Sequence, residues 1–223
     1  MATLLLVETA TTNCSVALSV KGKCTALKED NPHNTKGKTF SHAEKLHGYI
    51  ETLLNETNTH PNTIGAIAVS KGPGSYTGLR IGVSAVKGLC FAWEKPLIAV
   101  STLSVLAQRA GAKTMAVPLL DARRMEVYSA VFSTKKEQLC STGAQVLNEN
   151  SFNEYLQKGK VTFIGDGVEK FKPLCKHPNA VFMPNALPSA KYMAPLAEAK
   201  FNKKDFEDVA YFEPYYLKDF KTG

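Results

Sequence analysis

The chain has 223 residues, and its 27 lysines and arginines outnumber its 20 aspartates and glutamates, which gives a formal net charge of +7. Hydrophobic residues make up 44% of the sequence and charged residues 21%. There is therefore enough apolar side chain for a buried core, and the disordered and fibrous classes are excluded. The length allows one large domain or two small lobes.

The basic balance gives only weak evidence for a nucleic-acid partner. Only four of the cations are arginines, and the excess charge is shared between the two halves of the chain. Nucleic-acid binders usually concentrate their cations on one face and use arginine to grip phosphate. The pattern favours solvated lysines, with a weak, auxiliary RNA contact as the alternative.

The cysteines and the apolar segments indicate in which cellular compartment the protein is expected. The five cysteines include no CxxC pair, so they are expected to be free thiols of a reducing compartment. The N-terminus has no cationic region and only a short apolar run, unlike a signal peptide. Charges and Pro96 interrupt the longest apolar stretch, residues 81–100, so no membrane span is predicted. We expect a cytoplasmic protein.

The first half of the chain opens with three short β-rich runs and then changes to helical spacing. Residues 3–8, 13–20 and 23–28 predict three strands joined by turns. A helix is predicted over 41–55, with a capping box formed by Ser41 and Glu44. The later elements predicted for this half are a strand at 64–70, a tight loop at 72–78, a helix at 79–93, a strand at 97–100 and a helix at 102–110.

The second half repeats these types of element without repeating the sequence. Its predicted elements are strands at 115–120, 125–132 and 139–146, a helix at 151–158 with a Ser151/Glu154 capping box, a strand at 161–164, and a helix at 191–202 that bends or begins at Pro195. Two βββαβα units in tandem predict an α/β protein with a duplicated ribonuclease H-like fold. This is the arrangement of the actin-like ATPases (ASKHA), with two lobes that each contain a mixed sheet and flanking helices. We place the lobes at 1–111 and 112–223, and the last segment is a candidate for returning to the first lobe.

Residues 70–82, SKGPGSYTGLRIG, form the most distinctive segment. Three glycines at 72, 74 and 78, with Pro73 between the first two, stand between a strand and a helix. A rigid loop of this kind can direct backbone N–H groups toward an anion at the helix N-terminus. The segment lacks the Gly-Lys-Ser/Thr of a P-loop and the glycine spacing of a dinucleotide site. Anion binding and a purely structural turn both remain open.

Arg80 is predicted to lie in the first turn of the helix at 79–93. A cation there opposes the helix dipole at a cost of roughly 0.3–1 kcal/mol, so an acidic group should lie nearby. The candidates are Glu8, at the end of the first strand, and a bound phosphate or a partner carboxylate.

The same helix is rich in small residues, which favours close backbone approach. Glycine in a helix interior costs about 1 kcal/mol relative to alanine, and tight packing would compensate. The partner surface could be the chain's own sheet or a second helix from another chain. The small residues are Gly82, Ser84, Ala85 and Gly88, interleaved with Val83, Val86 and Leu89.

Six segments carry a resemblance to a known family. They are ETATTNCSVAL, FSHAEKL, GPGSYTGLRIG, LIAVSTLSVLA, LLDARRMEVY and EPYYLK, and they extend over almost the whole chain. The chain resembles the bacterial TsaB family, also called YeaZ. The resemblance implies an inactive actin-like paralogue that acts as a scaffold. Such a paralogue pairs as a heterodimer with the catalytic subunit TsaD and supports docking of TsaE. Together with threonylcarbamoyl-AMP synthase, these proteins make the threonylcarbamoyladenosine beside the anticodon of tRNAs that read ANN codons.

The resemblance also implies where the partner is contacted. The helices at 41–55 and 79–93 are expected to face the matching helices of TsaD, with the glycine-rich loop at or close to the contact. ATP and metal are expected on the partner subunits, and tRNA is contacted only indirectly or weakly. The loop candidates for the interface or for an anion are Gly72, Pro73, Gly74, Ser75, Thr77, Gly78 and Arg80, and the helix candidates are His42, Lys45, Leu79, Gly82, Val83 and Val86.

The sequence lacks the chemistry that an active member of this superfamily needs. Glu8 is followed by Thr-Ala-Thr-Thr and Asp121 by Ala-Arg-Arg, so neither lobe has a glycine-containing phosphate loop after its first strand. His42 and His47 are five residues apart and cannot present both rings on one helix face. We therefore assign no catalytic residue, metal or cofactor to the chain.

Three further expectations concern an alternative function, a turn in the second half of the chain, and self-association. An ATP-dependent actin-like transferase or kinase, active by itself, is the alternative function. Gly165-Asp166-Gly167 is either a relic of an adenosine-binding turn or an ordinary turn. Without its partner, the chain is expected to cover its apolar helical surface by forming a homodimer.

Overall fold

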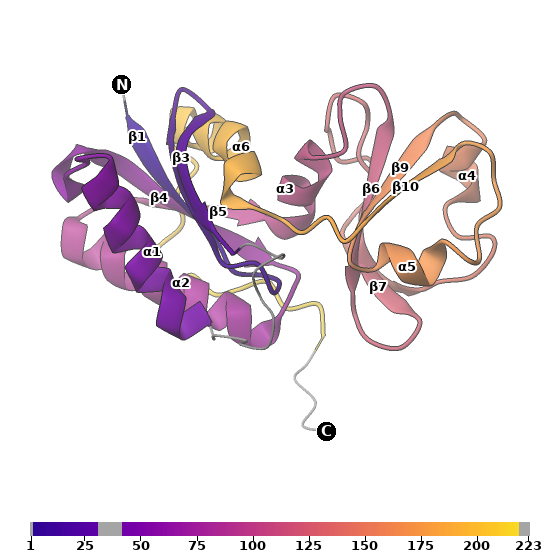
Figure 1. The fold of residues 1–223 in the computed structure, drawn as a ribbon, viewed down its shortest axis with the longest axis horizontal. Coiled ribbons are helices and arrows are strands. Elements are labelled where there is room, and N and C mark those ends of the chain that lie inside the picture. Colours follow the sequence, from indigo (N-terminus) through magenta and orange to yellow (C-terminus); the bar gives the residue numbers. More distant parts are fainter. Residues whose placement is uncertain (1, 31–41, 219–223) are drawn as a thin grey trace. The chain divides into compact units, whose positions relative to one another are not determined.

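The computed structural model describes residues 2–30 and 42–218, and these divide into two compact units (Figure 1). The first unit runs to Thr102 and also includes Pro188–Tyr216. The second comprises Leu103–Leu187 with Leu217 and Lys218. The predicted boundary at residue 111 therefore lies beyond the actual junction. Residues 188–216, predicted as part of the second lobe, belong to the first unit.

The first unit is built on a five-stranded sheet in the order β3-β2-β1-β4-β5. The central strand β1 pairs antiparallel with β2 and parallel with β4, as Leu5↔Leu18 and Leu6↔Ala68 show. The strands are β1 (Thr3–Glu8), β2 (Ser15–Val20), β3 (Lys23–Glu29), β4 (Ile64–Gly72) and β5 (Leu97–Ser101).

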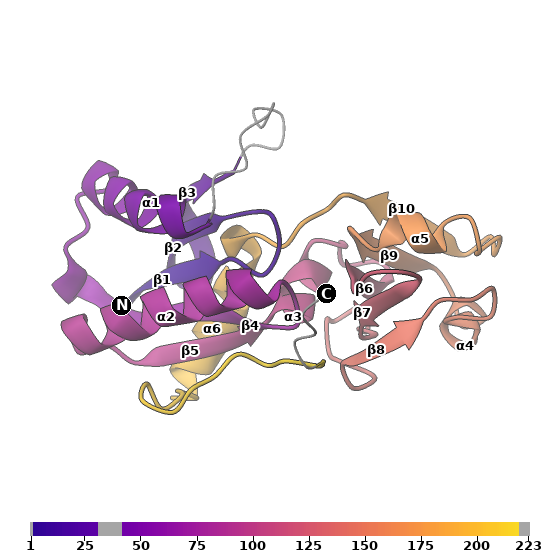
Figure 2. The same cartoon turned by 90° about the horizontal axis from the view of Figure 1, so that it is seen from below.

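Three helices cover the two faces of this sheet (Figures 1 and 2). Helices α1 (His42–Glu56) and α2 (Tyr76–Trp93) pack on one face, where Leu5 and Val7 of β1 meet Leu46 and Val83 in one apolar core. Helix α6 (Ala190–Asn202) packs on β1, β2, β3 and β5 from the other face. A 3₁₀ turn, η1 (Pro61–Thr63), leads from α1 into β4.

The second unit repeats the sheet order as β10-β9-β6-β7-β8. Its first strand, β6, again lies in the middle, antiparallel to β7 and parallel to β9. This repetition confirms the predicted duplicated ribonuclease H-like fold. The elements are α3 (Thr102–Gln108), β6 (Met115–Asp121), β7 (Glu126–Ser129), β8 (Gly143–Val146), α4 (Asn153–Leu156), β9 (Val161–Gly165), α5 (Val168–Phe171) and β10 (Ala180–Pro184).

The linking helices explain why the boundary prediction was wrong. Leu103, Leu106 and Ala107 of α3 pack in the core of the second unit, although α3 follows directly from β5 of the first. Helix α6 follows β10 of the second unit but packs on the first sheet. Each helix therefore belongs to the unit that its apolar face covers, and sequence order alone does not reveal this.

Several local predictions for the second half also needed correction. Helix α4 begins after Phe152, whose φ is 65°, and it has no side-chain cap; the Ser151 hydroxyl instead accepts a hydrogen bond from Asn148 N at 3.0 Å. The Ser151/Glu154 capping box was therefore wrong, and Ser41 of the other capping box lies outside the described residues. Helix α6 begins at Ala190 and contains Pro195, so it does not begin at that proline. Strand β10 and the four-residue helix α5 were not predicted.

The segment after α6 runs back along the first unit. Glu207 N donates to Leu97 O at 2.9 Å, and Tyr215 N donates to Lys71 O at 2.7 Å. The Lys87 ammonium of α2 donates to the carbonyls of Ala210 and Phe212, at 3.1 and 3.0 Å. This segment therefore covers the β5 edge and ties the end of β4 to α2.

Candidate functional site

The glycine-rich segment leads from β4 into α2, and the helix begins earlier than predicted. The Ser75 hydroxyl accepts a hydrogen bond from Gly78 N at 3.2 Å and caps the helix, so α2 starts at Tyr76. The predicted loop at 72–78 and the predicted helix start at Leu79 were therefore wrong. Serine is a favoured N-cap residue because its hydroxyl satisfies an N–H that the helix leaves open.

Three glycines at four-residue spacing place α2 directly against the chain segment that follows β1. A Cβ atom on Gly74 would lie 2.4 Å from Ala10 O, one on Gly78 2.1 Å from Thr9 O, and one on Gly82 2.1 Å from the Thr9 hydroxyl. Contacts this short are not tolerated, so only glycine allows this approach. The motif thus serves close packing within the first unit.

Two N–H groups that could have faced an anion are used inside the chain. Ser75 N donates to Ala10 O at 2.7 Å, and Gly78 N donates to the Ser75 hydroxyl. The structure therefore favours the structural interpretation of the loop. Of the predicted loop residues, Ser75, Thr77 and Arg80 are exposed, Gly74 is half-buried, and Gly72, Pro73 and Gly78 are buried.

Glu8, one of the two partners proposed for Arg80 from the sequence, does not contact it. It lies in the second turn of α2 and is exposed, with its guanidinium 5.3 Å from the centroid of the Tyr76 ring and 3.4 Å from the Tyr76 hydroxyl. Glu8 is fully buried and engaged elsewhere. The predicted conflict with the helix dipole was wrong because the helix starts four residues before Arg80.

Glu8 is held by groups of its own unit at the end of β1. The Ser70 hydroxyl donates to one carboxylate oxygen, and Ala10 N donates to the other at 2.8 Å. Burial raises the pKa of Glu8 to about 7, and hydrogen bonds from Ser70, Ala10 and Thr9 only partly offset this rise. Glu8 thereby fixes the turn that supports α2.

Helix α1 is fixed to the same region by two of the predicted interface residues. A ring nitrogen of His42, Nε2, lies 2.6 Å from Thr11 O. The Lys45 ammonium forms an ion pair with Asp30 at 2.7 Å, and the Tyr49 hydroxyl donates to the same oxygen at 2.9 Å. Burial opposes ionisation of Asp30, but the hydrogen bonds from Lys45 and Tyr49 leave its pKa below the ordinary value. His42 and Lys45 therefore have structural roles within the first unit.

The four apolar interface candidates on α2 are also part of the core. Leu79, Gly82, Val83 and Val86 are buried against the sheet, so they cannot offer side chains to a partner. The periodicity was correct, but the face assigned to solvent was the wrong one.

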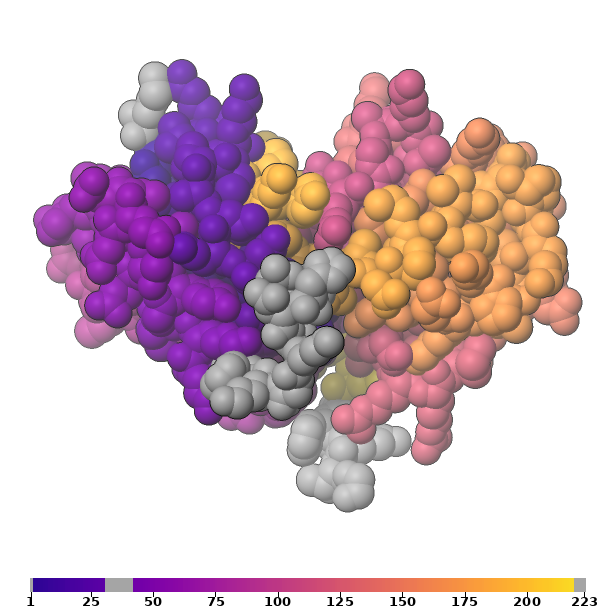
Figure 3. Space-filling model, in the orientation of Figure 1, coloured from indigo at the N-terminus to yellow at the C-terminus, as the bar shows by residue number. Residues whose placement is uncertain are grey.

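The outer faces of α1 and α2 border a shallow groove of about 420 Å³. Helix α1 lies at the surface in the view of Figure 3. The groove is largely apolar, and half of its lining residues are small. The lining residues are Ala43, Leu46 and His47 of α1 and Ile81, Ser84, Ala85, Gly88 and Leu89 of α2.

Gly88 differs from the other α2 glycines because no contact within the described residues requires it. A Cβ added to Gly88 would meet no atom within 4 Å, and the same holds for Gly48 of α1. A helix-interior glycine costs about 1 kcal/mol relative to alanine, and packing within the chain does not repay this cost at position 88. Gly88 lines the groove, whereas Gly48 does not. The groove is therefore our candidate functional site. It lies on the two helices proposed from the sequence, but the apolar residues proposed there, Leu79, Gly82, Val83 and Val86, do not line it.

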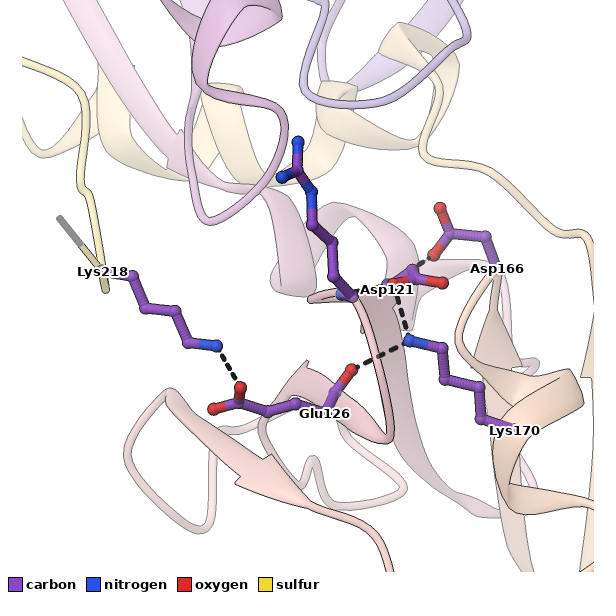
Figure 4. Close-up of polar contacts among 6 residues, drawn as sticks. Asp121, Glu126, Asp166, Lys170 and Lys218 are labelled. Atoms are coloured by element: carbon purple, nitrogen blue, oxygen red, sulfur yellow. Dashed lines mark hydrogen bonds and ion pairs between the residues drawn. The ribbon is translucent and has the colours of Figure 1, made fainter. Parts of the chain in front are cut away.

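In the second unit, Asp121 ends β6 just as Glu8 ends β1. Asp121 forms an ion pair with Lys170 at 2.7 Å, and Asp166 accepts a hydrogen bond from Asp121 N at 2.9 Å (Figure 4). Burial raises the pKa of Asp166, and the nearby Asp121 charge adds to this rise. Gly165 and Gly167 allow close approach to Leu119 O, so the Gly-Asp-Gly segment forms a packing turn.

The described ranges contain no cluster of three or more histidine, cysteine or acidic side chains placed to hold a metal ion. Within these ranges the cysteines are all unpaired thiols. In the same parts of the chain, no helix is both long and apolar enough to cross a membrane.

Comparison with known proteins gives matches over most of the chain. A family model described as TsaD, tRNA N6-adenosine threonylcarbamoyltransferase, matches residues 38–222. The tRNA threonylcarbamoyladenosine biosynthesis protein TsaB of Escherichia coli (strain K12) is 32% identical, and the alignment covers 97% of this chain and 94% of that protein. The chain belongs to the TsaB family. TsaB of Haemophilus influenzae is 30% identical over the same shares of the two chains.

Solved structures agree with the assignment to the TsaB family, also called YeaZ. The structure of YeaZ from Pseudomonas aeruginosa has a TM-score of 0.81 and 29% identity, covering 97% of this chain and 100% of that one. A shorter segment of the chain is also similar to tRNA N6-adenosine threonylcarbamoyltransferase. The tRNA N6-adenosine threonylcarbamoyltransferase of Staphylococcus saprophyticus is 46% identical over 59 residues, or 26% of this chain and 17% of that protein.

The glycine contacts make a prediction about stability. Gly78→Ala should lower the free energy of unfolding by about 1–3 kcal/mol, because the new Cβ overlaps Thr9 O and the backbone must shift. Gly88→Ala should raise it by up to about 1 kcal/mol, because that position is open. Urea denaturation of both variants measures this contrast, and equal effects would contradict the assigned packing.

The buried carboxyl makes a prediction about pH dependence. The pKa of Glu8 rises from 4.5 to about 7 on folding, so the folded state holds its proton more tightly. The stability that the protonated carboxyl gives is present below about pH 4.5 and is lost as the pH rises to about 7. Over this range Glu8→Gln should gain stability relative to the wild type by roughly 3 kcal/mol. Denaturant titrations across this pH range measure the difference, with Glu51→Gln, at an exposed carboxyl, as the control. A constant difference would contradict the raised pKa.

Proposed function

We propose that this chain is a non-catalytic subunit required for tRNA N6-threonylcarbamoyladenosine modification, and that it pairs with TsaD and supports docking of TsaE. The TsaB relatives, named as biosynthesis proteins of this modification, support the pathway. The match to the TsaD family model supports the pairing. Two proteins with the same fold can present equivalent helices to each other around a pseudo-two-fold axis.

The groove between α1 and α2 is the observation that carries the proposal. Half of its lining residues are small, so a helix of the partner can approach closely at these positions, which are Ala43, Ser84, Ala85 and Gly88. Gly88 lies open in this groove at a cost that only an external contact would compensate. The bulkier residues Ile81 and Leu89 are half-buried at the groove and supply apolar area for a partner to bury. We infer that TsaD places its equivalent helices here.

Contacts at the end of β1 support the proposal that this chain is not catalytic. Hydrogen bonds from Ser70 and Ala10 engage Glu8, and Thr9 and Ala10 are packed against the glycines of α2. An actin-like enzyme would need this space for nucleotide phosphates. We therefore assign no cofactor to this chain and expect ATP and metal on the partner subunits, with tRNA contacted weakly or indirectly.

The alternative is an ATP-dependent actin-like transferase or kinase that acts by itself. The shared fold is all that favours it, and fold does not determine function. Nucleotide binding by the isolated chain would support this alternative, whereas the proposed role requires none. Without TsaD, the same groove is expected to pair two copies of this chain in a concentration-dependent homodimer that TsaD displaces.

A reconstituted reaction tests the proposed role directly. Threonylcarbamoyl transfer to tRNA is measured with the synthase, TsaD and TsaE, with and without this chain, and also with this chain but without TsaD. We expect product only when both proteins are present. Product without TsaD would make this chain an enzyme, and full activity without this chain would remove the need for it.

Two leucine substitutions test the groove. Gly88→Leu should fill the groove and weaken binding to TsaD at least tenfold, while the stability of the isolated chain stays equal or rises by up to about 1 kcal/mol. Gly48→Leu is the matched control, since Gly48 is equally open but lies outside the groove. Titration calorimetry and thermal denaturation give both quantities. Equal TsaD affinity of the two variants would place the contact elsewhere.

A further inference from the structure

The hairpin between β6 and β7 presents two adjacent arginines with an uncommon backbone conformation. Ala122 N donates to Glu126 O, and Glu126 N donates to Arg123 O, both at 3.1 Å, so the connection is tightly closed. The φ angles of Arg123 and Arg124 are 67° and 50°. The left-handed region costs a residue other than glycine about 1 kcal/mol or more. Asparagine and glycine adopt it at lower cost, so stability does not explain the two arginines.

The base of this hairpin is held by acidic groups that have partners of their own (Figure 4). The Asp121 carboxylate accepts hydrogen bonds from the Lys170 ammonium at 2.7 Å and from Arg123 N at 2.6 Å. Lys170 also donates to Glu126 O at 3.2 Å, and the Glu126 carboxylate forms an ion pair with Lys218. Lysines and backbone groups thus engage these acids, and neither arginine guanidinium takes part.

Both arginine side chains are exposed, and within the described residues neither forms an ion pair. The other two arginines of the chain have contacts: Arg80 lies on Tyr76, and Arg109 donates to Leu187 O at 2.8 Å. Arginine is suited to phosphate because its planar fork can donate two parallel hydrogen bonds to an anion. A tight hairpin with a fixed base presents two such forks side by side.

We propose that the hairpin tip formed by Arg123 and Arg124 binds backbone phosphates of RNA. This inference rests on the proposed function, which brings the chain to a tRNA. A protein partner is disfavoured because a stable protein interface buries a large area, whereas this tip is narrow and Met125 is the only large apolar side chain in the segment 122–125.

The test removes the charge without straining the hairpin. The double substitution Arg123→Asn and Arg124→Gly suits the left-handed backbone, so the thermal midpoint should be unchanged or higher. The double substitution Lys172→Gln and Lys176→Gln removes the same charge from two exposed lysines of the same unit and serves as the matched control. A third variant, Arg123→Lys and Arg124→Lys, keeps the charge.

The measurement is tRNA binding by the complex of this chain with TsaD, followed by fluorescence anisotropy at several salt concentrations. Each lost phosphate contact should reduce the slope of log affinity against log salt by about 0.7–0.9. For the Asn-Gly variant, the slope of log affinity against log salt should therefore be smaller in magnitude by about 1.5. This variant should bind tRNA roughly 10- to 100-fold more weakly than the wild type at 0.1 M salt. The glutamine control should bind like the wild type, and the Lys-Lys variant should recover most of the slope.

Three outcomes would overturn the proposal. Unchanged tRNA affinity of the Asn-Gly variant would show that the arginines do not contact RNA. An equal loss in the glutamine control would reduce the effect to net charge. Weaker TsaD binding by the Asn-Gly variant would assign the arginines to a carboxylate of a protein partner. If the wild-type chain does not pair with TsaD, the proposed function fails, and the isolated chain still tests the arginines by the same titration.

Discussion

The close approach of α2 to the segment after β1 is the constraint on which the first unit depends. Gly74, Gly78 and Gly82 bring the helix backbone within reach of Thr9 and Ala10, and Ser75 N completes the contact with a hydrogen bond to Ala10 O. The Glu8 carboxylate stabilises the same turn by accepting a hydrogen bond from Ala10 N. Because the helix is fixed at this short distance, its opposite side is free to form a groove with α1.

The two units use the end of their central strand in two different ways. In the first unit, residues of the chain itself fill the end of the central strand, where Glu8 is buried and hydrogen-bonded. In the second unit, Asp121 is neutralised by Lys170 at the corresponding position, and the turn beyond it carries two arginines. These strand ends fix a helix in the first unit and a hairpin in the second.

Much of the fold could be predicted from the residues, and the errors have identifiable causes. The strands of the first sheet and the helix at 42–56 follow from period and composition. Helix α5 has only four residues, too few to show a helical period. The predicted start of α2 at Leu79 was wrong because the Ser75 hydroxyl caps the helix one turn earlier. The buried Val83 and Val86 were chosen as interface residues because a helix with apolar and small residues on several sides does not show which side meets its own sheet.

The sequence by itself determined the family, the duplicated order of strands and helices, and the lack of a glycine-containing phosphate loop after either Glu8 or Asp121. These properties depend on the type and spacing of neighbouring residues, which the chain displays directly. Only the tertiary structure decided that Gly82 faces Thr9 while Gly88 faces open space, and that α3 and α6 each pack on the unit encoded by the other half of the chain. Both depend on contacts between residues far apart in sequence, and local periodicity carries no information about such distances.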